Sequence, residues 1–569
     1  CIEKGICDKD AEKFSIALPP PNVTGILHMG HASLLTIEDI MVRFERMRGK
    51  KTLWLPGTDH AAIATQSKVE KELVKKEKKN RHDLGREKFL EKVGQFAQES
   101  HDTIVSQIRK MGASVDWSRE VFTLDETRNF AVRTAFKQMY DDGLIYRDYR
   151  VVNWDPKGQT TISDEEIVYE ERKANTYTFK YSKDFPISIA TTRPETKVGD
   201  TAVAVHPDDK RYKKYIGKEY DVEFCGVPLH IKIIADKDVD PEYGTGAVGV
   251  TPAHSMIDFE MSERHSLPMV QVINEYARMM VDTPELKDKK TKEAREIIVK
   301  WLEKQGLLEK TEEIDQNIST AERTGCVVEP LPKLQWFIDV NKKIKLERSK
   351  IDGIKAGEPV TLKELMKKVI DTDQIQILPD RFEKTYFNWI DNLRPWCISR
   401  QIWYGHRIPV WYRTDKEGNE EIYCGIEAPK DTDPSSDKDP ANSWIQDPDT
   451  LDTWFSSGLW TFSTLGWPEK TDDLKTYHPT NVLETGYDII FFWVARMILM
   501  TTYLTGEIPF EYVYIQGLVR DAKGQKISKS LGNNIDPIIL TEKYGTDALR
   551  MSLIVGVPPG NDNNMSEEK

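Results

Sequence analysis

The chain has 569 residues, of which 39% are hydrophobic and 30% charged, and this length suits several domains of ~100–200 residues each. The formal net charge of −13 argues against a general nucleic-acid coat, although an acidic body can carry a local basic patch. No apolar run approaches the ~18 residues that cross a bilayer, and no signal peptide is recognisable, so a cytoplasmic protein without a membrane segment is expected.

The first predicted elements are a strand and a helix joined by a proline-rich turn. Residues 13–18 alternate as in a strand, and apolar residues after His31 recur at helical spacing. His28 and His31 are three positions apart at the helix start and lie on one face, while Gly30 lets a ligand approach the backbone. Because a helix N-terminus attracts anions, this turn predicts a phosphate site, although an isolated pair of this kind is more commonly a plain cap.

The next strand is predicted at 52–55 and runs into the polar sequence Gly-Thr-Asp-His at 57–60. Polar residues at the carboxyl end of a parallel strand mark the usual place of a site in a doubly wound sheet. A Lys/Glu-rich run at 68–81 is predicted to be a solvated helix face, with nucleic-acid contact as the alternative. An amphipathic helix is predicted at 131–146.

Near residue 174 the pattern changes to short β-like runs broken by Gly, Pro and Asp, which predicts a separate β-rich domain. Its main elements are strands at 176–181, 187–191, 201–205, 227–234 and 247–251, and a charged helix at 291–305. An α/β pattern returns after residue 331, with strands at 375–378, 408–412, 481–484 and 513–516 and a strongly apolar helix at 489–504.

The last predicted loop holds Lys526 and Lys529, together with Gly524 and Ser528. Two cations three positions apart can bracket a polyphosphate as point charges. Lysines in surface loops are common, so this signal becomes specific only in combination with the histidine turn. The simplest architecture is α/β: a split Rossmann-like, doubly wound parallel sheet at 1–173 and 331–560, a β-rich domain inserted at 174–330, and a disordered tail at 561–569.

The histidine turn and the lysine loop together resemble the two signature sequences of the class I aminoacyl-tRNA synthetases. A wider set of motifs resembles the valine-specific branch of that family, whereas isoleucine- and leucine-specific relatives differ around Asn22 and Asp59. The set comprises Pro-Pro-Pro-Asn-Val-Thr-Gly at 19–25, Gly-Thr-Asp-His-Ala at 57–61, Asp-Trp-Ser-Arg-Glu at 116–120, Ala-Thr-Thr-Arg-Pro-Glu-Thr at 190–196, Asp-Thr-Trp-Phe-Ser-Ser at 452–457, and the stretches 396–411 and 488–493. The resemblance covers almost the whole chain but not the family's C-terminal anticodon-binding domain, so a catalytic and editing portion that charges tRNA poorly is expected.

The resemblance implies that valine is activated with ATP and Mg²⁺ and then transferred to tRNA(Val). It assigns His28, His31, Lys526 and Lys529 to the triphosphate and to the charge that develops on it. The ATP-binding positions are His28, Gly30, His31, Gly486, Asp488, Ile527 and Lys529, and the amino-acid-binding positions are Pro19, Asn22, Asp59, Trp454, Ile489 and Trp493. Gln516 stands where many relatives have histidine, which leaves its part in nucleotide binding open.

A second, hydrolytic site is implied because a valine pocket cannot reject the nearly isosteric threonine by fit alone. The β-rich insertion is its expected place. The residues that match the family's editing motifs are Thr191, Thr192, Arg193, Glu195, Thr196, His254 and Asp258. Gly249 and Ser255 stand where relatives usually carry Lys and Asp, so retained but altered editing of threonine is expected.

The cysteines predict neither a disulfide framework nor a zinc ribbon, because none of the six lies in a Cys-x-x-Cys pair. Many relatives carry a zinc ribbon at the position of 153–158, where Asp155 and Gly158 replace cysteines here. No structural zinc is therefore predicted, and stoichiometric zinc in the purified protein would refute this.

The protein is expected to be a monomer, and three alternative functions stay open. An isoleucyl-type synthetase is disfavoured by Asn22 and Asp59. A small nucleotidylyltransferase also uses a His-x-x-His turn but does not need a large β-rich insertion. A noncatalytic tRNA-binding paralogue has no need of the intact histidine and lysine pairs.

Overall fold

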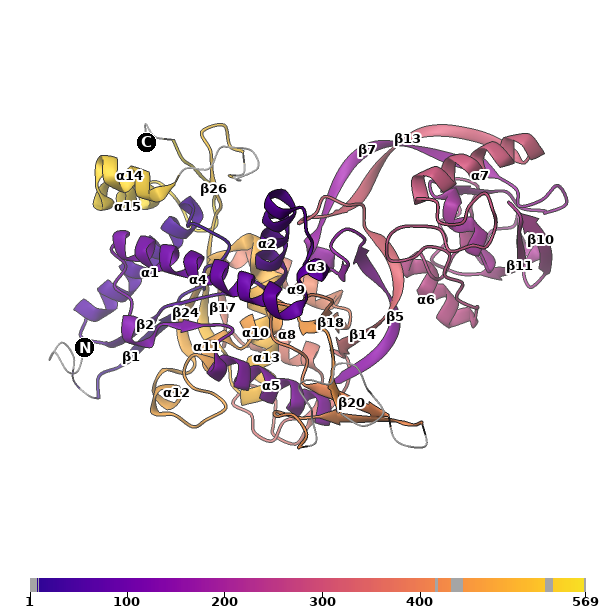
Figure 1. Cartoon of the computed structure of the whole chain (residues 1–569). Coiled ribbons are helices and arrows are strands. Elements are labelled where there is room, and N and C mark those ends of the chain that lie inside the picture. The colour runs from indigo at the N-terminus through magenta and orange to yellow at the C-terminus, as the bar shows by residue number, and fades with distance from the viewer. Residues whose placement is uncertain are drawn as a thin grey trace. The chain divides into compact units, whose positions relative to one another are not determined.

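The computed structural model describes residues 8, 10–414, 418–430, 444–525, 527 and 536–566. The chain forms two compact units, residues 1–146 together with 336–569, and residues 147–335 (Figure 1). The predicted insertion, 174–330, lies within the second unit. We call the two units the sheet unit and the inserted unit.

The sheet unit is built on five parallel strands in the order β17–β25–β24–β1–β2. Their bounds are β1 Lys13–Ala17, β2 Lys51–Leu55, β17 Gln376–Leu378, β24 Thr480–Gly486 and β25 Phe510–Gln516. Ile16 of β1 pairs with Trp54 on one side and with Val482 on the other. The strand order therefore reverses between β1 and β24, and the carboxyl ends of these two strands form the switch point where such sheets bind ligands.

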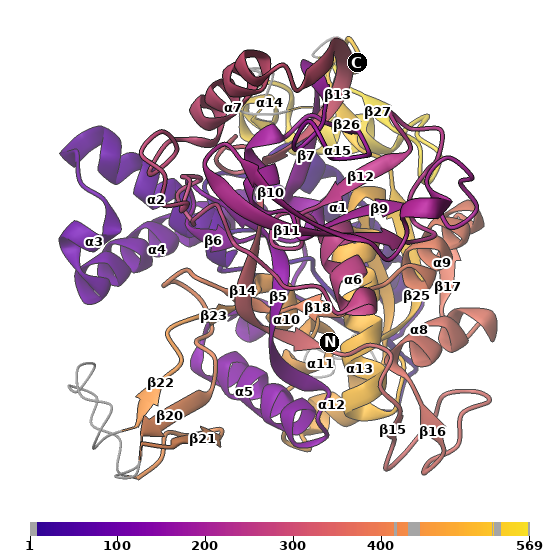
Figure 2. The ribbon, with the colours of Figure 1, turned by 90° about the vertical axis from the view of Figure 1, so that its right-hand side faces the viewer.

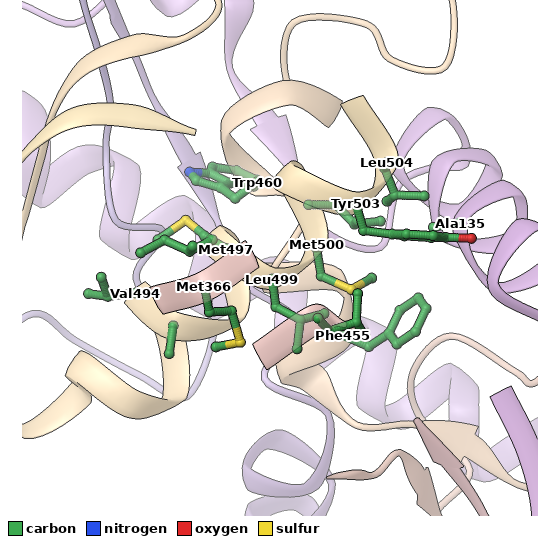
Figure 3. Packing of buried hydrophobic residues seen from close by; sticks show 14 of the residues in the cluster. Ala135, Met366, Phe455, Trp460, Val494, Met497, Leu499, Met500, Tyr503 and Leu504 are labelled. Carbon is green, nitrogen blue, oxygen red and sulfur yellow. The ribbon is translucent and has the colours of Figure 1, made fainter. Parts of the chain in front are cut away.

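Both faces of this sheet are covered by helices. On one face, α1 (Met29–Met47) packs on β1, β2 and β24, and α15 (Thr546–Ile554) packs on α1. On the other face, α5 (Glu126–Asp141), α8 (Leu362–Asp371) and α13 (Arg496–Thr505) share a large apolar core with the strands. Figure 3 shows part of this core, where Met497, Met500 and Tyr503 of α13 lie near Met366 and Phe455.

The sheet unit contains further helices and strands. The helices are α2 Ala62–Glu77, α3 Arg81–Leu84, α4 Arg86–Lys110, α9 Glu383–Asp391, α10 Thr453–Ser457, α11 Trp460–Ser463, α12 Asp472–Tyr477 and α14 Pro537–Tyr544. The strands are β3 Gly57–Thr58, β4 Val121–Phe122, β15 Ile344–Lys345, β16 Pro359–Val360, β18 Trp396–Cys397, β19 Ser399–Arg400, β20 Val410–Thr414, β21 Glu420–Cys424, β22 Ile445–Gln446, β23 Thr450–Leu451, β26 Val519–Arg520 and β27 Asn563–Asn564.

The apolar segment predicted as one helix at 489–504 has three parts. A 3₁₀ turn at Tyr487–Ile489 leads into a π-helical turn at Ile490–Ala495 and then into α13. Contrary to the sequence expectation, Tyr487–Thr505 is long and apolar enough to cross a membrane; it is the one such helix in the described part of the chain. Because 83% of its apolar window is buried, this segment is a core helix.

Two further predictions from the sequence, the end of one helix and the disorder of the tail, are wrong. The predicted helix at 131–146 ends early, because Gly143 adopts a left-handed φ of +66° and Ile145 already begins a strand. The tail predicted to be disordered is ordered up to residue 566, and its strand β27 pairs with β26. Asp562 anchors it by accepting the Leu518 backbone N–H at 2.9 Å and by an ion pair with Arg520.

The inserted unit contains the predicted β-rich sheet and one long ribbon that the sequence indicated only in part (Figure 2). The junction strands β5 (Ile145–Asp155) and β14 (Glu329–Ile338) connect the units, and within the insertion lie β6 Thr160–Thr161, β7 Ile167–Phe179, β8 Ile189–Thr191, β9 Ala202–Val205, β10 Glu219–Phe224, β11 Val227–Ala235, β12 Ala247–Val250, β13 Leu308–Ala321, α6 Met256–His265 and α7 Thr291–Gln305. Of the antiparallel pair β7–β13, the sequence predicted only the end of β7, within the strand at 176–181; the rest was missed because few of its residues are buried, so no buried face imposes an alternating pattern.

Candidate active site

The first half of the candidate site is the turn between β1 and α1. His28 is the N-cap of α1, and its Nδ1 accepts the Gly30 backbone N–H at 3.1 Å. His31 Nδ1 in turn accepts the His28 backbone N–H at 3.2 Å, which completes a capping box. The two rings lie 3.9 Å apart between centroids.

This capping arrangement fixes where the imidazoles can donate. Because each Nδ1 accepts a backbone N–H, a neutral His28 and a neutral His31 both carry their proton on Nε2. A Cβ at position 30 would lie 2.9 Å from the His28 ring, so glycine is needed for this ring position. The histidines are thus caps and at the same time present Nε2–H donors at a helix N-terminus, which suits a phosphate.

Residues next to Lys526 and Lys529 in the chain pack beside the turn that carries His28. β26 packs against α1, and Val519 shares a buried core with Leu27 and Met29, which flank His28. Ile527 packs against this core as well. Lys526 and Lys529 lie outside the described residues, so their positions stay predictions from the sequence.

Asp59 and Asn22 form the second half of the site. Their backbones pair in parallel, with the Val23 N–H donating to the Asp59 carbonyl and the Asp59 N–H donating to the Pro21 carbonyl, both at 2.9 Å. The Asp59 side chain is buried, and its Oδ2 accepts the Thr453 hydroxyl at 3.4 Å. A buried carboxylate with remaining acceptor capacity suits an ammonium group.

Two helical segments supply the predicted aromatic residues, and Trp454 directly follows Thr453 in the chain. The rings of Trp454 and Phe492 lie 5.4 Å apart between centroids and are tilted by 33°, and Trp493 is buried with its Nε1–H donating to the Ser457 carbonyl at 3.2 Å. Ile489 ends the 3₁₀ turn that follows Gly486 at the end of β24. The other predicted positions are Pro19, which is half-buried beyond β1, and Asp488, which is exposed.

Sequence reasoning missed two polar features near these residues. The Thr123 hydroxyl donates to Asp59 Oδ1 at 2.8 Å, although it lies 64 positions away and in no recognisable motif. Glu38 and Glu484 are both fully buried beneath the sheet's switch point, and burial raises the pKa of each well above its ordinary value. Trp54 Nε1 donates to Glu38 at 2.6 Å, and this hydrogen bond favours the charged carboxylate, so it opposes part of the effect that burial has on the pKa of Glu38.

In the inserted unit, Arg193 and Glu195 belong to a buried ion cluster. Arg193 pairs with Glu329 at 2.5 Å and with Glu195 at 3.3 Å, and Arg295 pairs with Glu195 at 2.7 Å. Burial alone would raise the pKa of Glu195, but hydrogen bonds from Arg295 and the Arg193 charge hold it below its ordinary value. These charges fix the backbone turn that carries Thr196.

Asp258 lies at the start of α6 and faces the end of β12. Its Oδ2 accepts the Thr251 backbone N–H at 2.8 Å. Lys197 donates to the Thr251 hydroxyl at 2.8 Å and to the Gly249 carbonyl at 2.7 Å. A Cβ at Gly249 would lie 2.3 Å from Asp200, so the space of a larger side chain is already filled in this protein. Thr192 follows Thr191 at the end of β8, and its hydroxyl accepts a hydrogen bond from the Gln316 side-chain amide at 3.1 Å.

Both ring nitrogens of His254 contact backbone groups. Its Nε2 accepts the N–H groups of Val272 and Ile273 at 2.9 and 3.2 Å, and its Nδ1 lies 3.2 Å from the Pro330 carbonyl. Burial lowers the pKa of His254 to about 3. The ring is therefore a neutral structural element of the insertion.

This pKa predicts acid sensitivity. The unfolded chain binds a proton at His254 below its ordinary pKa whereas the folded chain does not, so stability is lost as the pH falls. Between about pH 7.5 and about pH 5 the wild type is expected to lose about 2 kcal/mol of unfolding free energy more than His254→Gln, which keeps an acceptor near Nε2. Urea unfolding followed by a probe in the insertion measures this, and equal losses in both proteins would contradict it.

The segment around Asp155 carries a hydrogen-bonded turn. Asp155 accepts the Lys157 backbone N–H at 3.0 Å and the Thr324 hydroxyl at 2.8 Å, and the four cysteines of the described chain are free thiols. Within the described ranges no group of three or more His, Cys, Asp or Glu residues is arranged to hold a metal ion. The absence of structural zinc remains a prediction.

Comparison with known proteins places these features in one family. The model of the tRNA synthetases class I (I, L, M and V) matches residues 3–566. The chain is 48% identical to the valine–tRNA ligase of Bacillus licheniformis over 568 residues and 48% identical to that of Geobacillus kaustophilus over 567. In both cases 99% of this chain aligns, but the chain spans only 61% of the length of these curated relatives.

A solved structure supports the fold. The crystal structure of Agrobacterium radiobacter K84 LeuRS in a ternary complex with tRNA and LeuAMS matches with a TM-score of 0.51 at 19% identity, over 99% of this chain and 72% of that one. Its likeness, together with the parallel sheet and the β-rich insertion, confirms the predicted fold class. The chain belongs to the class I tRNA synthetases of the I, L, M and V group.

Proposed function

We propose that this chain activates valine with ATP to form valyl-adenylate and belongs to a protein that transfers valine to tRNA(Val). The observation that carries the proposal is the turn after β1, which presents two imidazole donors at the α1 N-terminus and pairs through Asn22 with Asp59. The identity of 48% to valine–tRNA ligases supports valine as the substrate. The cytoplasmic location and the monomeric state stay predictions from the sequence.

In the proposed reaction a valine carboxylate oxygen attacks the α-phosphorus of ATP, and the bond from that phosphorus to the bridging oxygen of pyrophosphate breaks. This chemistry needs alignment and charge stabilisation more than a general base. The Nε2–H groups of His28 and His31 donate to phosphate oxygens, and Asp59 holds the α-ammonium group. Lys526 and Lys529 stabilise the leaving pyrophosphate, and Gly486 and Asp488 lie by the ribose.

Magnesium enters this reaction as part of the nucleotide substrate. In the described ranges the side chains form no carboxylate cage, and Mg²⁺ in nucleotide sites is commonly bound by phosphates and water with few protein ligands. Its chemical contribution is to neutralise phosphate charge.

The test is amino-acid-dependent ATP–pyrophosphate exchange with valine, isoleucine, leucine and threonine. Fast exchange with valine and slower exchange with threonine is expected. Exchange led by isoleucine or leucine would overturn the assignment of the pocket. Absence of exchange with all four amino acids, in a folded protein, would favour the noncatalytic tRNA-binding alternative.

We also propose that the inserted unit hydrolyses threonyl-tRNA, with Asp258 holding the threonine ammonium. Support comes from the buried Asp258 carboxylate, of which one oxygen accepts the Thr251 N–H. An Asp258→Asn variant is expected to lose about tenfold or more in threonyl-tRNA hydrolysis, because a buried charge pair is lost. Its valine exchange rate serves as the internal control, and unchanged hydrolysis would contradict the role of Asp258.

A further inference from the structure

The Asp59 carboxylate is held by a buried hydroxyl group. Thr123 Oγ1 donates to Asp59 Oδ1 at 2.8 Å and accepts the His60 backbone N–H at 2.9 Å. Thr123 is 1% exposed and His60 is 0% exposed, so water does not compete for these bonds.

The His60 ring approaches the same hydroxyl. Its Nδ1 lies 2.7 Å from Thr123 Oγ1 and 3.1 Å from Asp59 Oδ1. Because the single hydroxyl proton goes to the carboxylate, Oγ1 can only accept from the ring, and His60 therefore carries its proton on Nδ1. The Thr123 hydroxyl therefore donates one hydrogen bond and accepts two, and these three bonds fix its orientation.

His406 supports the other side of the His60 ring. The two rings meet edge to face, with centroids 5.0 Å apart and planes at 88°. His406 Nδ1 lies 3.2 Å from Asn129 Oδ1, and burial lowers the pKa of His406 well below its ordinary value, so this ring is neutral. A neutral, packed neighbour holds the His60 ring in place without adding charge behind Asp59.

We propose that Thr123, His60 and His406 are positioning residues for the recognition of the substrate α-ammonium group. They fix Asp59 Oδ1 from behind and leave Oδ2, whose contact in the described chain is the 3.4 Å bond from Thr453, for the substrate. This inference rests on the proposed function, in which Asp59 binds the ammonium. It does not depend on valine, because every amino acid carries that group.

The test uses substitutions that change the hydroxyl and little else. Thr123→Val keeps the shape and removes the hydroxyl, and is expected to raise the KM for valine in ATP–pyrophosphate exchange about tenfold. The KM for ATP and the kcat are expected to stay within about twofold, because nucleotide contacts are untouched. Thr123→Ser returns the hydroxyl and is expected to recover most of the lost affinity.

The matched control is Thr501→Val on α13. The Thr501 hydroxyl is buried and has no hydrogen-bond partner among the residues that the structure describes. This variant is expected to leave both KM values unchanged. The melting temperatures of Thr123→Val and Thr501→Val separate a loss of folding from a loss of substrate binding.

A second pair of variants keeps the inference testable if Thr123→Val does not fold. His60→Asn retains an N–H donor near the position of Nδ1, whereas His60→Leu has none, so a lower KM for valine in His60→Asn is expected. Equal KM values for valine in wild type and Thr123→Val, or in the two His60 variants, would overturn the inference while leaving valine activation intact. If another amino acid is the substrate, the same KM comparisons are made with that amino acid. If the folded protein shows no exchange with any amino acid, both proposals are overturned.

Discussion

Replacing His28 with Asn is expected to lower the kcat of valine-dependent ATP–pyrophosphate exchange by about 10²–10³-fold, the usual cost of one transition-state hydrogen-bond donor. Asn is a favourable N-cap and can accept the Gly30 N–H as His28 Nδ1 does. It offers no donor at the position of Nε2, however. The melting temperature is therefore expected to stay at the wild-type value while the rate falls.

The control for this variant is another N-cap of the sheet unit. Thr361 caps α8 through the Glu364 N–H at 3.1 Å, and Thr361→Asn exchanges one good cap for another away from the switch point. Its exchange rate is expected to match the wild type. A His28→Asn protein with a wild-type kcat would show that His28 acts only as a cap.

Replacing Asp59 with Asn is expected to raise the KM for valine about 100-fold, which corresponds to about 3 kcal/mol, because a buried ammonium would lose its counter-charge. The shape and one oxygen acceptor are kept. The KM for ATP is expected to change little, since Asp59 makes no proposed contact with the nucleotide. Steady-state exchange measured over valine and ATP concentrations separates the two constants.

The matched substitution for this experiment is Asp473→Asn. Asp473 pairs with Arg119 at 2.9 Å in the same unit, but its side chain is 37% exposed and belongs to no proposed site. Both KM values are expected to remain at wild-type level in this variant. A KM for valine that does not rise in Asp59→Asn would remove Asp59 from the amino-acid site.

The elements of the sheet were predictable from sequence because burial imposes their patterns. All five strands of the parallel sheet fall within a few residues of their predicted positions. The inserted ribbon β7–β13 was not predictable in the same way, since its exposed positions leave charged residues on both faces. The end of α5 was misplaced because the left-handed Gly143 outweighs the apolar spacing of the residues that follow it.

The candidate site was predictable wherever its residues stand in a contiguous motif. His28 and His31 lie in one turn, and Asn22 and Asp59 each lie in a recognisable stretch. The roles of Thr123 and His406 were not predictable, although His406 stands in the matching stretch 396–411, because their links to Asp59 and His60 join distant parts of the chain that only the fold brings together. His254 was recognised by its motif, but its bonds to three backbone groups, which make it a structural residue, depend on tertiary packing.

The most direct measurement of the central claim is the identity of the adenylate that the protein forms. The purified chain would be incubated with ATP, pyrophosphatase and an equimolar mixture of the twenty common amino acids, and the retained aminoacyl-adenylate identified by mass spectrometry. Valyl-adenylate as the main product, with a minor threonyl species and with both formed about 10²–10³-fold more slowly by His28→Asn, is the predicted result. An adenylate of isoleucine or leucine as the main product, or none from the folded wild type, would contradict the account.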